Sequence, residues 1–189
     1  MNQLPVTRAA ESFLARAGTG AFPHVTQIEA SRLIAAAPTS ETRLKLKILW
    51  HTGCRVSELL GIRVDDLNHE RSSLKLKRLK RRKEFLQDVP VPPELMNELK
   101  LFVRAKQRRG RVFNGDRFSA FRIIRTLGRR VLGRSVAPKH FRHGRAYHLV
   151  TVKNVHPIIA SRALGHASMS SILSYVHPSE QDLRVALED

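Results

Sequence analysis

A single change in hydrophobic period, between residues 74 and 91, limits the possible folds of this chain more than any other feature. Leu74 and Leu76 alternate with lysines, and residues 85–91 form a second short stretch that is typical of a strand. Residues 80–83, between the two stretches, are four consecutive basic residues, which suit an exposed turn. This pattern predicts one antiparallel hairpin or three-stranded sheet within an otherwise helical chain.

Helical patterns fill most of the remaining sequence, and proline or glycine separates them. Thr26 and Glu29 have the spacing of a capping box, and Gly53 is placed to end a second helix. Three prolines stand where helices are expected to begin, because proline is tolerated in a first turn. The expected helices are 9–17, 26–37, 40–51, 55–60, 93–107, 116–132, one from 138, 157–164 and a short one over 168–176. In the helix over 116–132, one apolar face is expected to hold Phe118, Phe121, Ile124 and Leu127.

The predicted fold class is therefore mainly α with a small antiparallel β-sheet, an α+β arrangement. A length of 189 residues is about one domain, enough to bury a core without disulfides. The single cysteine, Cys54, excludes an intrachain disulfide and fits a reducing, cytoplasmic compartment. We expect Cys54 to be a small buried residue, and Trp50 and Tyr147 to pack in the core.

The chain is strongly basic, with a formal net charge of +18 from 34 Lys and Arg against 16 Asp and Glu. Such a charge predicts a polyanionic partner, and double-stranded DNA is the default interpretation. An anionic membrane surface and a ribosome-associated role are the alternatives. Residues 44–50 are among the longest apolar stretches, which fall well short of the roughly 20 residues of a spanning helix. No membrane insertion and no signal peptide are predicted.

Four functional side chains, which lie in three separate segments, suit one kind of chemistry. Cleaving a phosphodiester without a metal requires a nucleophile, cations for the transition state, and a proton donor for the leaving oxygen. Tyr175 can be the nucleophile, Arg55 and Arg142 the cations, and His166 lies nine residues before Tyr175. Each residue alone has an ordinary interpretation, such as an ion pair between Arg55 and Glu58.

In combination, these segments resemble the tyrosine recombinase (phage integrase) family. Residues 52–59 are similar to its first signature box, 142–146 to its second and 164–175 to its third, while 78–80 resemble its catalytic hairpin. The resemblance covers about residues 24–178. It implies the catalytic-domain fold that this family shares with type IB topoisomerases. It also implies a site-specific DNA recombinase of the integrase, invertase or resolvase type, which needs neither metal nor nucleotide. Four protomers are expected to join two DNA sites through a Holliday junction.

The resemblance also implies a role for each matching residue. Tyr175 would form a 3′-phosphotyrosyl bond, Arg55 and Arg142 would grip the phosphate, and His166 would help to hold it. A lysine of the basic hairpin would protonate the leaving oxygen; Lys80 is the expected one, although Lys77 and Lys83 lie in the same hairpin. Further DNA contacts are expected from Lys77, Arg78, Arg81, Arg82, Lys83 and His143.

One position departs from the family's pattern. The second box normally has a histidine three residues before its arginine, and here that position is Lys139. His140 lies one place later and would point about 100° away on a helix. We therefore assign the catalytic position to Lys139, as in type IB topoisomerases. This choice leaves a DNA-relaxing activity open as an alternative, and a non-catalytic DNA-binding accessory protein as another. His140, His143 and His148 invite a metal interpretation, but no nearby cysteine or acid completes the set.

The expected organisation has three parts. Residues 1–22 form an N-terminal arm, residues 23–178 the DNA breaking and rejoining domain, and residues 179–189 a tail helix. Most members of the family carry an N-terminal domain that clamps the DNA, and residues 1–22 are too few for one. In the family such a tail docks on a neighbouring subunit, and the same is expected here.

Overall fold

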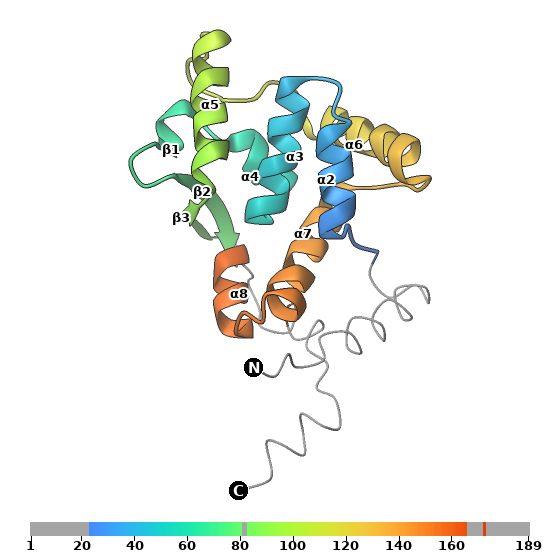
Figure 1. Ribbon diagram of the computed structural model, residues 1–189. Coiled ribbons are helices and arrows are strands. Elements are labelled where there is room, and N and C mark those ends of the chain that lie inside the picture. Colours follow the sequence, from blue (N-terminus) through green and yellow to red (C-terminus); the bar gives the residue numbers. More distant parts are fainter. Residues whose placement is uncertain (1–22, 81–82, 166–171, 173–189) are drawn as a thin grey trace, which may run out of the picture.

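The computed structural model describes residues 23–80, 83–165 and 172. Within these residues the chain is mostly helical and carries one three-stranded antiparallel sheet (Figure 1). The predicted fold class is therefore confirmed. The expected helix over 9–17, most of the turn over 168–176 and the tail over 179–189 lie outside the described residues.

The first two helices are α2 (Gln27–Ala35) and α3 (Ser40–Thr52). The predicted capping box is present: the Glu29 amide donates to Oγ1 of Thr26, and the Thr26 amide donates to the Glu29 carboxylate. Thr39 caps α3 by accepting a hydrogen bond from the Thr42 amide, and the helix begins at Ser40, where the sequence predicts its start. Gly53 ends α3 as predicted, with a φ of 57°.

A short helix and the sheet follow. Helix α4 (Val56–Gly61) leads through a 3-10 turn, η1 (Val64–Asp66), to the two-residue strand β1 (Leu67–Asn68). Strands β2 (Ser73–Lys80) and β3 (Lys83–Pro90) then form the predicted hairpin. The sheet order is β1-β2-β3, and the β2–β3 register ends where Lys80 faces Lys83.

The second half of the described chain is helical. It contains α5 (Pro93–Ala105), α6 (Arg117–Leu132), α7 (Pro138–Tyr147), a π-helical turn η2 (His148–Val152) and α8 (Pro157–Leu164). Proline occupies the first position of α5, α7 and α8, as the sequence predicts.

The expected apolar face of α6 is partly wrong. Ile124 and Leu127 are buried, but Phe118 is 75% exposed. A series of residues three apart falls short of the 3.6-residue turn and rotates by about 60° at each step. Phe118 therefore lies on roughly the opposite side of α6 from Leu127, and the buried stripe runs through Ala120 instead.

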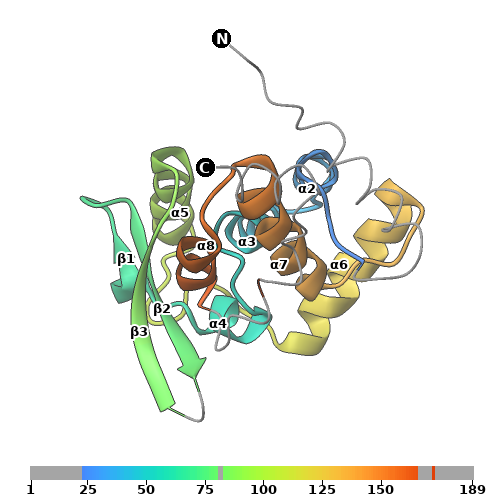
Figure 2. The same cartoon turned by 90° about the horizontal axis from the view of Figure 1, so that it is seen from below.

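Helix α3 lies at the centre of the fold. It contacts α2, α4, α5 and α7, and its residues Leu46, Ile48 and Leu49 are fully buried in the main core. Seen from below, the sheet and α5 lie on one side of α3, and α2 and α6 on the other (Figure 2). No helix among the described residues is long and apolar enough to cross a membrane.

A second, smaller cluster joins α7 to α8. It consists of Ala146, Ala160, Leu164 and Ile172, all buried. The cluster packs the end of α8 against α7. Leu164 also lies against Gly53, so the turn after α3, α7 and the end of α8 meet in one place.

Candidate active site

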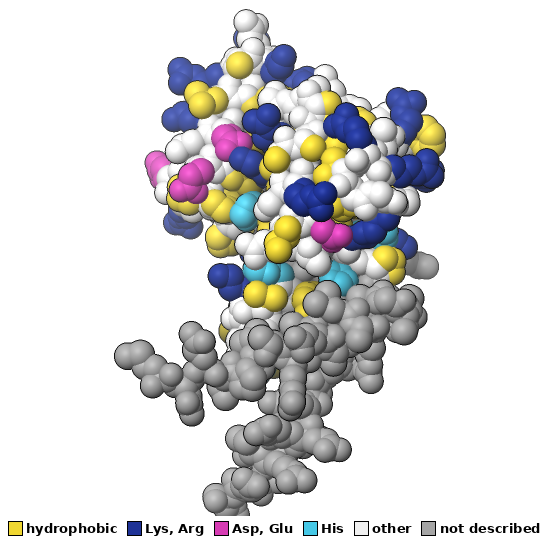
Figure 3. Space-filling model, turned by 45° about the vertical axis from the view of Figure 1, so that its right-hand side comes forward, with side chains coloured by type: hydrophobic (Ala, Val, Ile, Leu, Met, Phe, Trp, Pro, Cys, Tyr) yellow, Lys and Arg dark blue, Asp and Glu magenta, His cyan; other side chains and the backbone are white. Residues whose placement is uncertain are grey.

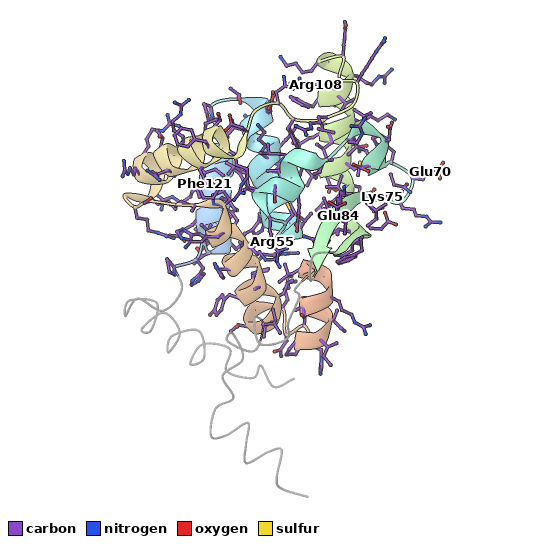
Figure 4. All side chains as sticks on the ribbon, turned by 180° about the vertical axis from the view of Figure 1, so that it is seen from behind. Arg55, Glu70, Lys75, Glu84, Arg108 and Phe121 are labelled. Carbon is purple, nitrogen blue, oxygen red and sulfur yellow. The ribbon has the colours of Figure 1, made fainter. Side chains whose placement is uncertain are left out.

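Arg55 stands at the N-cap of α4, immediately after the sharp turn at Gly53. One of its Nη atoms donates to Oε1 of Glu58 at 2.8 Å, and its backbone amide donates to Oε2 of the same carboxylate at 2.9 Å. Glu58 is buried, whereas the Arg55 side chain is 43% exposed. The ion pair with Glu58, which the sequence offered as the ordinary interpretation of Arg55, is present, and it orients a guanidinium that still faces solvent. Figure 4 shows Arg55 where α4, α7 and α8 come together.

The turn at Gly53 packs directly against the end of α8. A Cβ atom on Gly53 would lie 2.3 Å from Cδ2 of Leu164, and the φ of 57° also favours glycine. The segment before Arg55 and the segment before residue 166 are thus in contact, although more than 100 residues separate them in sequence.

Arg142 joins the same two segments from α7. Its Nη1 donates to the carbonyl oxygens of Gly53 and Leu164, each at 2.8 Å. Burial, followed by the charge of Arg55, lowers the pKa of Arg142 to about 10. Arg142 therefore stays protonated at neutral pH, close enough to Arg55 for repulsion between them. Two guanidinium groups held this close together suit an anionic ligand such as a phosphate.

The first turns of α7 carry the residues around the unusual lysine. Lys139 is exposed and His143 is half-buried. Burial, then the charges of Lys139 and Arg142, lower the pKa of His143. His140 is buried, and its Nδ1 accepts a hydrogen bond from the Ala137 amide at 3.2 Å. His140 thus belongs to the start of the helix, and Lys139 is the residue at the surface beside Arg142.

The basic hairpin is described in part. Lys77 is exposed and forms an ion pair with Glu84 across the two strands at 2.6 Å. Lys80 ends β2 opposite Lys83, which begins β3, and their side chains lie outside the described part of the structure. The other expected site residues that lie outside it are Arg81, Arg82, His166 and Tyr175.

Among the expected DNA contacts whose side chains are described, Arg78 is the one that lies in the interior, so its assignment is wrong. It is 1% exposed, and its guanidinium forms an ion pair with Glu58 in the interior. The alternation of a strand explains this burial, because Arg78 shares the inward face of β2 with Leu74 and Leu76, which are both fully buried. The alternation of inward and outward residues along β2 therefore indicates that Arg78 is buried. The prediction of a DNA contact considered only the positive charge of the segment and did not use this alternation.

The remaining residues with ordinary interpretations behave largely as expected. Cys54 is buried, and burial raises the pKa of its thiol to about 11, so it is unreactive at neutral pH. Trp50 is buried in the main core. Tyr147 is only half-buried, with its ring centroid 5.2 Å from that of His24. Among the described residues, no group of three or more His, Cys, Asp and Glu side chains could hold a metal ion.

The chain is similar in sequence to known recombinases. The model of the phage integrase family matches residues 23–182. Tyrosine recombinase XerA of Pyrococcus furiosus is 30% identical over 176 residues, which cover 87% of this chain and 60% of the relative. A tyrosine recombinase of Thermosipho africanus is 30% identical over 167 residues, 84% of this chain and 58% of that protein. The chain thus spans about 60% of the length of these relatives.

Solved structures share the fold. The crystal structure of XerA recombinase superimposes with a TM-score of 0.71 at 24% identity, covering 88% of this chain and 64% of that one. The catalytic domain of bacteriophage HP1 integrase gives a TM-score of 0.67 at 20% identity, covering 89% of this chain and 96% of that domain. The fold is that of these catalytic domains, and the chain belongs to the phage integrase family.

Proposed function

We propose that this protein is a site-specific DNA recombinase that cuts and rejoins double-stranded DNA through a 3′-phosphotyrosine. The observation that carries the proposal is that Arg55 and Arg142 lie close together and that hydrogen bonds to other residues hold each guanidinium in place. Glu58 holds the first, and the carbonyls of Gly53 and Leu164 hold the second. Family membership supports the same activity, and a solved relative of the same fold, XerH, was crystallised bound to its difH substrate.

The proposed reaction is an exchange of one phosphodiester for another. The Tyr175 phenol gives its proton to a water molecule and its oxygen bonds to phosphorus, while the bond from phosphorus to the 5′ oxygen breaks. Arg55 and Arg142 neutralise the non-bridging oxygens with help from His166, and a lysine of the hairpin, Lys80, gives a proton to the leaving 5′ oxygen. The energy of the broken bond stays in the phosphotyrosine, so rejoining needs no nucleotide.

Trapping the covalent adduct tests this proposal directly. Supercoiled DNA carrying fragments of the source genome is incubated with the protein in EDTA, and SDS then arrests any protein–DNA linkage. We expect an adduct from the wild type and from Tyr147→Phe, and none from Tyr175→Phe. Tyr147 is the matched control because the chain has only two tyrosines. An adduct that survives in Tyr175→Phe would refute the assignment of the nucleophile.

The same assay measures the two arginines. Arg55→Ala and Arg142→Ala each remove a cation from the transition state, so cleavage should slow by about 10²-fold or more, by analogy with the loss of one oxyanion-site donor. Arg63→Ala is a suitable control, because Arg63 is exposed and precedes η1. Near-normal cleavage by either active-site variant would exclude its proposed role.

Assembly is a further part of the proposal. Four protomers would join two DNA sites on the nucleoid, and the tail over residues 179–189 would dock on the neighbouring subunit. Sedimentation of the protein with its trapped DNA site should show a tetramer that deletion of residues 179–189 disrupts. An unchanged tetramer would exclude the tail from assembly.

Lys139 favours a second candidate, a topoisomerase-like relaxing enzyme. Its exposed ammonium stands one helical turn before Arg142, where it can bind a phosphate but is a poorer neutral base than histidine. This function predicts relaxation of supercoiled DNA by a monomer without recombinant products. Recombinant products from two trapped sites would decide in favour of the recombinase.

A further inference from the structure

Arg78 is an unusual buried charge, because it connects three elements that surround the candidate site. Its Nη1 contacts Oε2 of Glu58 on α4, and its Nε donates to Oε1 of Gln87 on β3 at 3.1 Å. Its Nη2 points to the carbonyl oxygen of Ala163 on α8 at 3.4 Å. A fully buried guanidinium is costly unless such partners satisfy it, so this position is specified by its surroundings.

Gln87 extends the connection from the second strand of the hairpin. Its amide oxygen accepts the hydrogen bond from Arg78, and its Nε2 donates to the carbonyl oxygen of Arg162 at 2.8 Å. Both strands of the hairpin are therefore tied to the last turn of α8. No backbone pairing joins the sheet to α8 among the described residues, so these side chains form the link.

Side chains from other elements donate hydrogen bonds to the backbone carbonyls at the end of α8. The carbonyls of four successive residues accept from side chains: that of Arg162 from Gln87, that of Ala163 from Arg78, and those of Leu164 and Gly165 from Arg142. The last carbonyls of a helix lack the usual backbone donor four residues on, so cationic and amide donors suit them. The Arg162 carbonyl also accepts a hydrogen bond from the Gly165 amide. Gly165 packs on Arg78 itself, since a Cβ there would lie 2.9 Å from its Nε.

Glu58 links this arrangement to Arg55. One carboxylate oxygen binds the Arg55 guanidinium, and the other binds Arg78 and the Arg55 amide. The hairpin, the chain immediately before residue 166 and the first phosphate-binding arginine thus share one set of hydrogen bonds. Glu58 is also held by the Arg55 amide and the end of α8 by Arg142, so these two anchors stay in place when a hairpin side chain is removed.

We propose that Arg78 and Gln87 form a latch that holds the β2–β3 hairpin, and the lysine it carries, in register with Arg55 and Arg142. Both are positioning residues: they act through the hairpin and do not contact DNA. The proposal deepens the function proposed above and rests on it, because a hairpin lysine must be the proton donor for the leaving oxygen.

A sulfur-substituted substrate shows whether a variant cleaves slowly because its proton donor is misplaced or because the site is damaged in another way. The probe is a duplex containing the cleavage site found in the adduct assay, with either oxygen or sulfur at the 5′ bridging position. A thiolate leaves without a proton, since a thiol has a pKa of about 8.5. We expect Gln87→Ala to cleave the oxygen substrate about 10²-fold more slowly than wild type at saturating DNA, the loss typical of a misplaced catalytic group. Its cleavage of the sulfur substrate should equal that of the wild type.

Leu86→Ala is the matched control, because Leu86 precedes Gln87 on the same strand and is 63% exposed. It should cleave both substrates at the wild-type rate. Arg78→Lys retains a cation beside Glu58 but loses the fork to Gln87 and α8, so it should show the same selective loss as Gln87→Ala.

The outcomes are distinguishable. Equal rates for Gln87→Ala and wild type on the oxygen substrate would overturn the latch, as would equal slowing on both substrates, which indicates general damage. Failure of the wild type to form a Tyr175-dependent adduct would instead refute the proposed function. A melting temperature measured for each variant confirms that the folded protein is being compared.

Discussion

Glu58 shows how one residue can serve two cations with different tasks. Its carboxylate orients the partly exposed Arg55 on one side and compensates the fully buried Arg78 on the other. The two arginines differ because one begins a helix at the surface while the other lies on the inward face of a strand. Residue type alone therefore does not tell an arginine that is available to a ligand from one that is buried in an ion pair; the position of the residue in its helix or strand does.

His140 gives a prediction about the pH dependence of stability. Burial, followed by the charges of Lys139 and Arg134, lowers its pKa to about 4. The unfolded chain takes up this proton near pH 6.5, whereas the folded protein resists it until about pH 4. The contribution of neutral His140 to the free energy of unfolding is present above pH 6.5 and is lost as the pH falls to about 4. The free energy of unfolding should fall by about 1–3 kcal/mol over this range.

Urea unfolding between pH 4 and pH 8 measures this effect. His140→Gln cannot be protonated, so its unfolding free energy should decline less than that of the wild type over this window. The exposed His69 is the control, and His69→Gln should follow the wild-type curve. Parallel curves for the wild type and His140→Gln would contradict the prediction.

At the level of single residues, the sequence predicts contacts that are local in the chain. The pairs Thr26–Glu29 and Arg55–Glu58 lie three residues apart, and both are present. The partners of Arg78 and Arg142 could not be predicted this way, because they lie on other elements. For Arg78 the alternation of β2 would have indicated burial, but nothing in the sequence identifies Gln87 or α8 as its partners.

Helix ends position the site at the level of elements. Gly53 ends α3 and turns the chain so that Arg55 begins α4, and Gly165 ends α8 just before residue 166. The sequence predicted these boundaries well, because glycine and proline act locally on the backbone. It could not predict that the two glycine turns lie in one place, which depends on the packing of α7 against α3 and α8.

Two glycine caps allow the packing role of Gly53 to be measured. Gly53 and Gly133 both end a helix with positive φ, at 57° and 67°. A Cβ on Gly133 meets nothing within 4 Å, whereas one on Gly53 overlaps Leu164. Gly133→Ala should therefore cost only the backbone strain of about 1 kcal/mol. Gly53→Ala should cost about 1–3 kcal/mol more, as overpacking does.

Denaturant unfolding of both variants gives the difference, and the adduct assay gives its consequence. Gly53→Ala should also slow cleavage, since Arg142 donates to the Gly53 carbonyl, while Gly133→Ala should not. Equal destabilisation by the two substitutions would show that the contact with Leu164 carries no energy.

At the scale of the whole molecule, the positive charge is spread widely. Lys and Arg side chains are scattered over the face drawn in Figure 3, and Arg108 lies at the far end of α5 from Arg55 in Figure 4. Exposed basic residues surround Arg108, among them Arg104, Lys106, Arg109 and Arg111. Net charge therefore predicts a nucleic-acid partner without locating the surface that binds it; under the proposed function, that surface is the one that carries Arg55 and Arg142.

The salt dependence of DNA binding tests this location. Each phosphate contact releases counterions, so the logarithm of the association constant falls linearly with the logarithm of salt concentration. Each contact adds about 0.9 to the steepness of this slope. Lys139 is exposed beside Arg142, and Lys139→Gln should reduce the slope by about 1. Arg109→Gln removes the same charge near the far end of α5 and should leave the slope unchanged.

Fluorescence anisotropy with a labelled duplex at several salt concentrations provides both slopes. Because the two variants have the same net charge, a difference between them reports the docking surface alone. A smaller slope for Arg109→Gln and an unchanged one for Lys139→Gln would place the DNA on the opposite end of the molecule.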